Sequence, residues 1–168
     1  MRIKNKHILD VTCGGRSIWF NKNHPHALYC DKRNETVDIE WKKEKHIIRP
    51  LEIRPDIVCD FTDLPFDDNS FYLIVFDPPH AKNLSEKSWM KRKYGDLPDN
   101  WKPIIKGGFD DCMRVLRLGG TLVFKWSDVQ IRTADVIKAI GEEPLFGHRS
   151  GKRSNTHWMT FMKPPEAA

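Results

Sequence analysis

Short apolar runs separated by turn-forming residues dominate the chain, and they predict a sheet of mostly buried strands. We expect strands at residues 7–12, 27–30, 56–59, 71–76 and 121–126, and a closing antiparallel pair at residues 144–149 and 157–162. Apolar residues at helical spacing predict helices over residues 101–118 and 132–140, with Gly119 and Gly120 capping the first. Because strands alternate with helices, the pattern predicts an α/β fold around a mostly parallel sheet.

Three segments fit this pattern less well. Residues 16–23, between the first two strands, support a short helix at most, and residues 36–50 are compatible with a hairpin. Residues 80–100 show no periodicity. An irregular segment of this length inside a compact domain is usually functional or disordered, so we look for function there.

Length and composition limit the class of protein. A chain of 168 residues with 39% hydrophobic content can form one well-cored domain, so we expect a single domain over residues 1–168 without a separate target-recognition domain. The N-terminal segment becomes acidic at Asp10 before a signal-peptide core develops, and no apolar run approaches the roughly 20 residues of a membrane span. We therefore expect a soluble, cytoplasmic protein without membrane contact.

The cysteines and the net charge change this picture little. The four cysteines are Cys13, Cys30, Cys59 and Cys112. They are far apart in the sequence and form no C-x-x-C pair, so we expect reduced thiols and no metal site. A formal charge of +5 and a pI near 9.0 suit a polyanionic partner, but many unrelated proteins share such an excess. The distribution of charge is therefore more informative than its total.

Candidate chemistry gathers where the expected strands end, and in open parallel sheets ligands bind at that edge. Each of the first four strands is followed by a glycine turn or a carboxylate, and the residues concerned are Asp10 with Gly14 and Gly15, then Asp31, then Asp60 with Phe61, then Asp77. Asp31 lies about twenty residues beyond Asp10, an offset suited to accepting hydrogen bonds from ribose hydroxyls. Alternatively, the glycines form a plain turn and the carboxylates cap helices.

The fourth strand ends abruptly in Asp77-Pro78-Pro79-His80. Proline fixes φ and has no N–H, so two in succession prevent both a further strand ladder and an immediate helix. The backbone carbonyl of Pro78 is then left free of regular structure and available to a ligand.

These two motifs together resemble the class I S-adenosylmethionine-dependent methyltransferases, and specifically those that modify exocyclic amino groups in nucleic acids. The residues that carry the resemblance are the turn of residues 8–16 and the tetrad of Asp77 to His80, which is similar to a (D/N/S)-P-P-(Y/F/W) motif. The resemblance spans residues 8–126. It implies a Rossmann-like sandwich with a mostly parallel seven-stranded sheet and an antiparallel C-terminal strand.

The resemblance also implies a set of binding residues for S-adenosylmethionine. Asp10, Thr12, Cys13, Gly14 and Gly15 would surround the methionine moiety, Asp31 would accept the ribose hydroxyls, and Asp60 with Phe61 would lie against the adenine. Thr12 and Arg16 replace two glycines of the usual turn, and Cys13 also fits a plain small buried residue.

By the same resemblance, Asp77, Pro78, Pro79 and His80 are the candidate catalytic residues. Asp77 and the carbonyl of Pro78 would each accept an N–H of the target amine and direct its lone pair toward the methyl group. His80 stands where an aromatic residue usually stacks on the flipped base. Imidazole can stack or titrate near neutrality, so both roles stay open.

The loop between Lys82 and Tyr94 combines five basic residues with Trp89 and Tyr94. Bases stack on aromatic side chains while basic residues follow phosphates, so we expect this loop to contact RNA or DNA. The alternative is a solvated charged loop. Two rival functions also stay open: methylation of a small molecule or a protein amide, and a non-catalytic module that binds S-adenosylmethionine.

Overall fold

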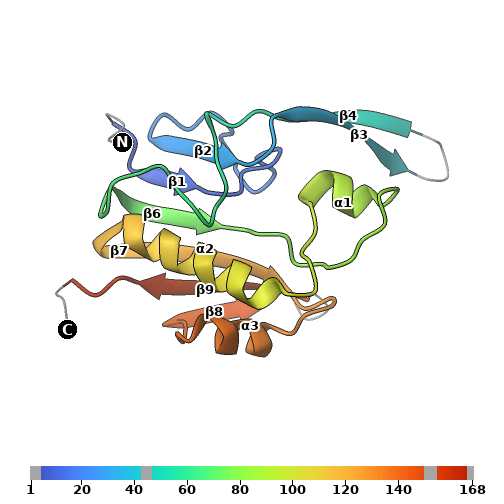
Figure 1. The fold of residues 1–168 in the computed structure, drawn as a ribbon. Helices are drawn as coiled ribbons and strands as arrows, with labels where there is room; N and C mark the ends of the chain where they lie inside the picture. Colours follow the sequence, from blue (N-terminus) through green and yellow to red (C-terminus); the bar gives the residue numbers. More distant parts are fainter. Residues whose placement is uncertain (1–4, 43–46, 150–154, 166–168) are drawn as a thin grey trace.

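The computed structural model describes residues 5–42, 47–149 and 155–165, in which six strands precede the first helix (Figure 1). The strands are β1 Ile8–Asp10, β2 Ala27–Asp31, β3 Glu35–Lys42, β4 Ile47–Ile53, β5 Ile57–Val58, β6 Phe71–Phe76, β7 Leu116–Ser127, β8 Phe146–Arg149 and β9 Thr156–Met162. The helices are α1 Trp89–Tyr94, α2 Trp101–Val115 and α3 Thr133–Ile140.

Seven of these strands form one sheet in the order β5-β2-β1-β6-β7-β9-β8. β9 is antiparallel to both of its neighbours, and the pairings among β5, β2, β1, β6 and β7 are parallel. The prediction of a mostly parallel seven-stranded sheet with an antiparallel C-terminal strand is confirmed. β1 pairs with β2 on one side and β6 on the other, so the strand order reverses there and a ligand crevice is expected beyond β1 and β6.

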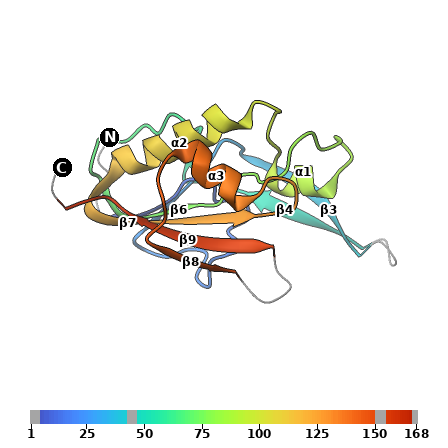
Figure 2. The same cartoon turned by 90° about the horizontal axis from the view of Figure 1, so that it is seen from below.

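The main core lies between the sheet and the two longer helices, and Figure 2 shows α2 and α3 on the same side of the sheet. Alternate residues of β7, namely Leu122, Phe124 and Trp126, are fully buried, and they share this core with Ile105 and Phe109 of α2. On the other face, a smaller apolar cluster covers β1 and β2, with Trp19 packed against buried Cys13, Ala27 and Tyr29.

The predicted end of the first long helix and the short helix considered for residues 16–23 are both wrong. The first long helix ends at Val115, and Leu116 already begins β7 in register with Phe71, so Gly119 lies inside a strand and does not cap the helix. Leu116 is fully buried in this pairing, which outweighs its fit to the helical pattern. Residues 16–23 form turns instead of a helix, because Arg16 adopts φ +54° and its guanidinium donates to the carbonyl of Lys22 at 2.8 Å.

Two expectations about irregular segments have a definite outcome. The hairpin expected over residues 36–50 is confirmed by the antiparallel pairing of β3 with β4, which project beyond the seven-stranded sheet in Figure 1, and residues 43–46 lie outside the described part of the chain. The segment of residues 80–100 contains α1 and a bridge between Lys82 and Leu97, so it is ordered by its own short elements. α1 lies against β3, near the carboxyl ends of the parallel strands.

Candidate functional site

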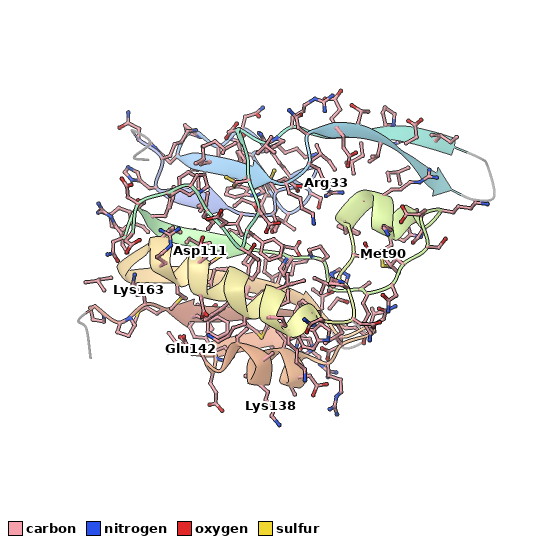
Figure 3. The ribbon with its side chains drawn as sticks, viewed as in Figure 1. Arg33, Met90, Asp111, Lys138, Glu142 and Lys163 are labelled. Carbon is pink, nitrogen blue, oxygen red and sulfur yellow. The ribbon has the colours of Figure 1, made fainter. Side chains whose placement is uncertain are left out.

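A cleft opens at the carboxyl ends of β1, β2 and β6, under the hairpin and α1. Its walls come from six parts of the chain: the turn after β1, the end of β2, strand β4, the segment after β5, the tetrad after β6, and the C-terminal end of α1. The lining residues are Val11, Thr12, Cys13, Gly14, Gly15, Ser17, Asp31, Lys32, Arg33, Leu51, Phe61, Asp77, Pro79, Lys93, Tyr94 and Gly95. Figure 3 labels Arg33 beside this cleft and Met90 on the helix that closes one side of it.

The glycine turn after β1 is held in place by β2. The N–H of Cys13 donates to the carbonyl of Cys30 at 2.8 Å, and the N–H of Gly14 donates to Oδ2 of Asp31 at 2.9 Å. Gly14 has φ +48°, a conformation that favours glycine. At Gly15, an added Cβ would lie 2.5 Å from Cδ1 of Leu51, so glycine lets the hairpin approach the turn closely.

Asp31 is the most heavily used acceptor at the cleft. Its Oδ1 accepts from the backbone N–H and the Nε–H of Arg33, at 3.0 and 3.2 Å, while Oδ2 accepts from Gly14. A carboxylate has about four acceptor positions, so these three bonds leave one for a ligand hydroxyl. A second hydroxyl could be accepted only if Arg33 moved.

Arg33 also ties α1 to the sheet. Its Nη1 and Nη2 donate to the carbonyls of Arg92 and Lys93, at 3.1 and 3.4 Å. The guanidinium therefore joins Asp31 at the end of β2 to the last turn of α1, whose carbonyls attract cations. This contact holds Lys93 and Tyr94 at the cleft wall.

Two of the residues predicted to bind the cofactor do not line the cleft. Asp10 is 1% exposed, and its carboxylate accepts from Nε1–H of Trp19 at 2.7 Å and from the N–H of Thr12 at 3.2 Å. The pKa of Asp10 is raised to about 7, chiefly by burial and to a smaller extent by the charges of Asp77 and Asp31, while these hydrogen bonds act in the opposite direction. Asp10 therefore supports the turn from behind.

The carboxylate of Asp60 also forms local hydrogen bonds and does not line the cleft. Its Oδ1 accepts from the backbone N–H and the hydroxyl of Thr62, at 3.0 and 2.8 Å, and the neighbouring Phe61 provides the cleft wall. Cys13 does line the cleft, but burial raises the pKa of its thiol to about 12, so the sulfur stays protonated and serves as a small apolar group.

The tetrad meets the glycine turn directly. The N–H of Asp77 donates to Oγ1 of Thr12 at 2.9 Å, which joins the two motifs at the switch point of the sheet. Thr12 thus makes a contact that the glycine usual at this position in the resembled family could not make. Asp77 and Pro79 line the cleft, whereas Pro78 is buried.

The side chain of Asp77 has a partner that the sequence did not reveal. Nζ of Lys125, on the adjacent strand β7, lies 2.6 Å from Oδ2 of Asp77, and the two side chains are only 19% and 16% exposed. The parallel register of β6 and β7 pairs Phe76 with Phe124, so Asp77 and Lys125 follow side by side.

His80 lies between Tyr94 and Trp126, with ring-centroid distances of 6.1 and 6.3 Å, and it does not line the cleft. Burial lowers the pKa of its imidazole, although the Asp77 carboxylate and a hydrogen bond to the backbone of Pro78 act in the opposite direction. The ring is therefore neutral at pH 7. The carbonyl of Pro78, expected to be free, accepts this hydrogen bond from His80, and only its second lone pair remains.

The basic loop is only partly available to a partner. Lys91 pairs with Glu86 at 2.6 Å and with Asp96 at 3.3 Å. Lys82 pairs with Asp99 at 3.1 Å, whereas Lys93 lines the cleft. Two basic side chains of the loop are exposed, Lys87 and Arg92, together with the half-exposed Trp89.

Several cleft-lining residues were not found from the sequence: Ser17, Lys32, Arg33, Leu51 and Gly95. Lys125, which does not line the cleft but pairs with Asp77, was not found either. Arg33 had a usable signal, since a cation two residues after a strand-terminal aspartate can bond it. Leu51 had none, because the hairpin must first fold over the turn.

Two features are absent from the described part of the chain. No helix there is long and apolar enough to cross a membrane. Among the same residues, no group of three or more His, Cys, Asp or Glu side chains is placed to hold a metal ion.

Comparison with known proteins identifies the fold. No protein-family model and no curated protein matches the sequence of this chain. Among solved structures, the Haloferax volcanii putative methyltransferase in complex with the Trm112 activator is 13% identical with a TM-score of 0.55, over 98% of this chain and 84% of that one. The N-methyltransferase NodS of Bradyrhizobium japonicum is 16% identical with a TM-score of 0.54, over 95% and 86% of the two chains.

These structures establish the fold and no more. The chain has the Rossmann-like fold of S-adenosylmethionine-dependent methyltransferases. The [4+2]-cyclase SpnF shares this fold, at 13% identity and a TM-score of 0.51 over 97% of this chain and 77% of that one. Fold alone therefore does not fix the reaction, which has to be argued from the site.

Proposed function

We propose that this chain is an S-adenosylmethionine-dependent methyltransferase that methylates an exocyclic amino group of a base in RNA or DNA. The observation that carries the proposal is the hydrogen bond from the N–H of Asp77 to Oγ1 of Thr12 at 2.9 Å. It brings the glycine turn and the Asp-Pro-Pro-His tetrad to one cleft, as a transfer between cofactor and target requires.

The residues at the cleft fit S-adenosylmethionine. Gly14 leaves open space beside the turn, and Asp31 keeps an acceptor position for a ribose hydroxyl. Phe61 and Leu51 supply apolar surface for the adenine. NodS, which has the same fold, has been solved with S-adenosyl-L-homocysteine.

When bound, S-adenosylmethionine supplies a methyl group on a positively charged sulfur that is already activated for attack. The task of the protein is to align the amine, whose lone pair is delocalised into the base. The carboxylate of Asp77 and the carbonyl of Pro78 accept one N–H each, and this favours a tetrahedral nitrogen. As the C–N bond forms and the methyl–sulfur bond breaks, the carboxylate also stabilises the positive charge that develops on nitrogen, until the nitrogen releases its extra proton to water.

A nucleic acid is the favoured target because of what surrounds the tetrad. Tyr94 lines the cleft beside Asp77, and the loop that carries it also exposes Trp89, Lys87 and Arg92. Aromatic rings with nearby cations suit a flipped or single-stranded base. A protein amide or a small amine would use Asp77 in the same way, but would not need this loop.

The test has two parts. First, S-adenosylhomocysteine is titrated into the protein by calorimetry, and saturable binding is expected. Second, radiolabelled S-adenosylmethionine is supplied with total RNA, denatured DNA, protein and small-molecule fractions, and label is expected in a nucleic-acid fraction as a methylated amino base. Label found only in the protein or small-molecule fraction would show that the substrate is one of these and not a nucleic acid. Binding without label in any fraction would indicate a non-catalytic module.

A further inference from the structure

Lys125 is the charged group closest to Asp77, and its position is unusual. Its neighbours along β7, Phe124 and Trp126, point into the main core, so Lys125 projects from the opposite face of the sheet. There its ammonium lies 2.6 Å from Oδ2 of Asp77 and 5.8 Å from the ring centroid of Trp158 on β9. β9 places Trp158 in register with Lys125, so β7 and β9 together fix the direction of the side chain.

A purely structural role would be to balance negative charge. The charges of Asp31 and Asp77 both act on Asp10, and a lysine beside Asp77 reduces this repulsion. That role requires a positive charge nearby, but it does not require a donor directly beside the oxygen that faces the target amine. Lys125 provides both.

Lys125 and Asp77 together place a hydrogen-bond donor beside a hydrogen-bond acceptor. Asp77 uses one of the three N–H donors of the ammonium, and Oδ1 of Asp77 remains for the target amine. An amino group on the Watson–Crick edge of adenine or cytosine stands next to a ring nitrogen that accepts hydrogen bonds. On the same edge of guanine, the amino group stands next to a ring N–H, which would face the ammonium.

We propose that Lys125 is a specificity-determining residue, which donates to the ring nitrogen next to the target amine while Asp77 accepts from the amine itself. The inference rests on the proposed methylation of a base. It restricts the target to adenine or cytosine and disfavours guanine. Enzymes that act on flipped bases read the Watson–Crick edge by such hydrogen bonds.

The test uses random-sequence single-stranded oligonucleotide pools, as DNA and as RNA, in which one base only carries an exocyclic amine. Adenine, cytosine or guanine is combined with thymine or uracil and with hypoxanthine, which lack this group. Methylation of the adenine or cytosine pool is expected, and methylation of the guanine pool alone would overturn the assignment. If no pool is methylated although S-adenosylhomocysteine binds, the proposed nucleic-acid function itself is wrong.

A second comparison isolates the role of Lys125. The accepted base is replaced by 1-deazaadenine or 3-deazacytosine, which keep the amine and lose the ring nitrogen. The wild type is expected to methylate the deaza pool about 10- to 100-fold more slowly, as expected when one good hydrogen bond to a base is removed. Lys125→Met is expected to methylate both pools at the same reduced rate, because the donor is gone.

Folding is controlled separately. Lys125→Arg keeps the charge and the donors, and is expected to keep part of the discrimination against the deaza base. Lys106→Met, on the exposed surface of α2 where Lys106 pairs with Asp110, is expected to discriminate as the wild type does. If Lys125→Met binds S-adenosylhomocysteine normally and still discriminates as strongly as the wild type, Lys125 only balances charge and the proposal is wrong. If Lys125→Met does not fold, the comparison of normal and deaza pools with the wild type is the test. Equal rates of methylation on the two pools would then refute the proposed role of Lys125.

Discussion

The N–H of Gly14 donates to Oδ2 of Asp31 at 2.9 Å, so the glycine turn after β1 and the acidic end of β2 act as one unit. The same carboxylate binds Arg33, which holds the end of α1. Loss of this side chain would therefore remove the proposed ribose acceptor and also loosen the turn and the cleft wall.

We expect Asp31→Ala to weaken the binding of S-adenosylhomocysteine by tenfold or more, since unpaired ribose hydroxyls cost about 1 to 3 kcal/mol. Calorimetric titration measures this directly. Asp110→Ala is the matched control, because Asp110 is an exposed carboxylate paired with Lys106 on α2, away from the cleft. Wild-type affinity in Asp31→Ala would mean that the cofactor does not use the end of β2.

Two adjacent glycines of α2 provide a second test. A Cβ at Gly108 would lie 2.4 Å from Cδ2 of Phe61, whereas a Cβ at Gly107 would meet nothing closer than 4.0 Å, from Thr62. Phe61 is a cleft wall, buried to 7% exposure between this helix and Phe76. Glycine at position 108 therefore allows α2 to pack against the proposed adenine wall.

We expect Gly108→Ala to lower the free energy of unfolding by about 1 to 3 kcal/mol, through overpacking, and to weaken cofactor binding by displacing Phe61. Gly107→Ala should instead raise stability by up to about 1 kcal/mol, because alanine favours a helix. Urea denaturation of the two variants measures the difference. Equal stability of both variants would show that Phe61 is not confined by α2.

The third prediction concerns pH and Asp10. Burial raises the pKa of Asp10 to about 7 in the folded chain, above the roughly 3.9 of an unfolded aspartate, so the folded chain holds the proton more tightly. The contribution of Asp10 to stability is therefore greatest below about pH 4, falls as pH rises toward 7, and is constant above that. The full change is at most about 4 kcal/mol at 1.36 kcal/mol per pKa unit.

The measurement is urea denaturation from pH 4.5 to 8 for the wild type, Asp10→Asn and the exposed control Asp110→Asn. Asp10→Asn is expected to lose this downward slope, while Asp110→Asn keeps it. A slope that is unchanged in Asp10→Asn would mean that Asp10 ionises normally in the folded chain.

The fourth prediction compares two kinds of basic side chain in the segment that leads into α1 and in α1 itself: those that are exposed and those that are paired with a carboxylate. Replacing Lys87 and Arg92 by Gln should weaken the binding of single-stranded nucleic acid and reduce the log-log salt slope by up to about one unit for each phosphate that is no longer bound. Lys91→Gln is the contrasting variant. Because Lys91 is committed to Glu86 and Asp96, its loss should leave the salt slope unchanged. A slope unaffected by the Lys87 and Arg92 changes would show that the loop is a solvated surface.

The sheet was predictable because its strands are apolar runs with clear turn signals, and parallel strands place their carboxyl ends at one edge. That alone brought Gly14, Asp31, Phe61 and Asp77 together. The end of α2 was not predictable, since Leu116 fits a helical pattern equally well and only its pairing with Phe71 makes it a strand residue. The role of Asp10 was not predictable either. Its carboxylate accepts a hydrogen bond from Trp19, and the turn that brings Trp19 there is not specified by the local sequence.

The contribution of Lys125 depends on long-range register. It lies 48 residues beyond Asp77, and only the parallel pairing of β6 with β7 makes the two neighbours. The hairpin and α1 are a similar case, because Leu51 and Tyr94 reach the cleft through tertiary contacts. The sequence thus predicts the edge of the sheet where the cleft lies. The wall formed by the hairpin and α1 could be found only from the structure.

The central claim is that Asp77 orients an amine for methyl transfer, and one measurement tests it most directly. Transfer of radiolabelled methyl from S-adenosylmethionine to the accepted nucleic-acid fraction is compared for the wild type, Asp77→Asn and Asp77→Ala, with S-adenosylhomocysteine affinity measured for each. Asp77→Ala is expected to abolish transfer with cofactor affinity within a few-fold of the wild type. Asp77→Asn is expected to retain more activity, since an amide oxygen still accepts one N–H. Wild-type turnover by Asp77→Ala would contradict the account.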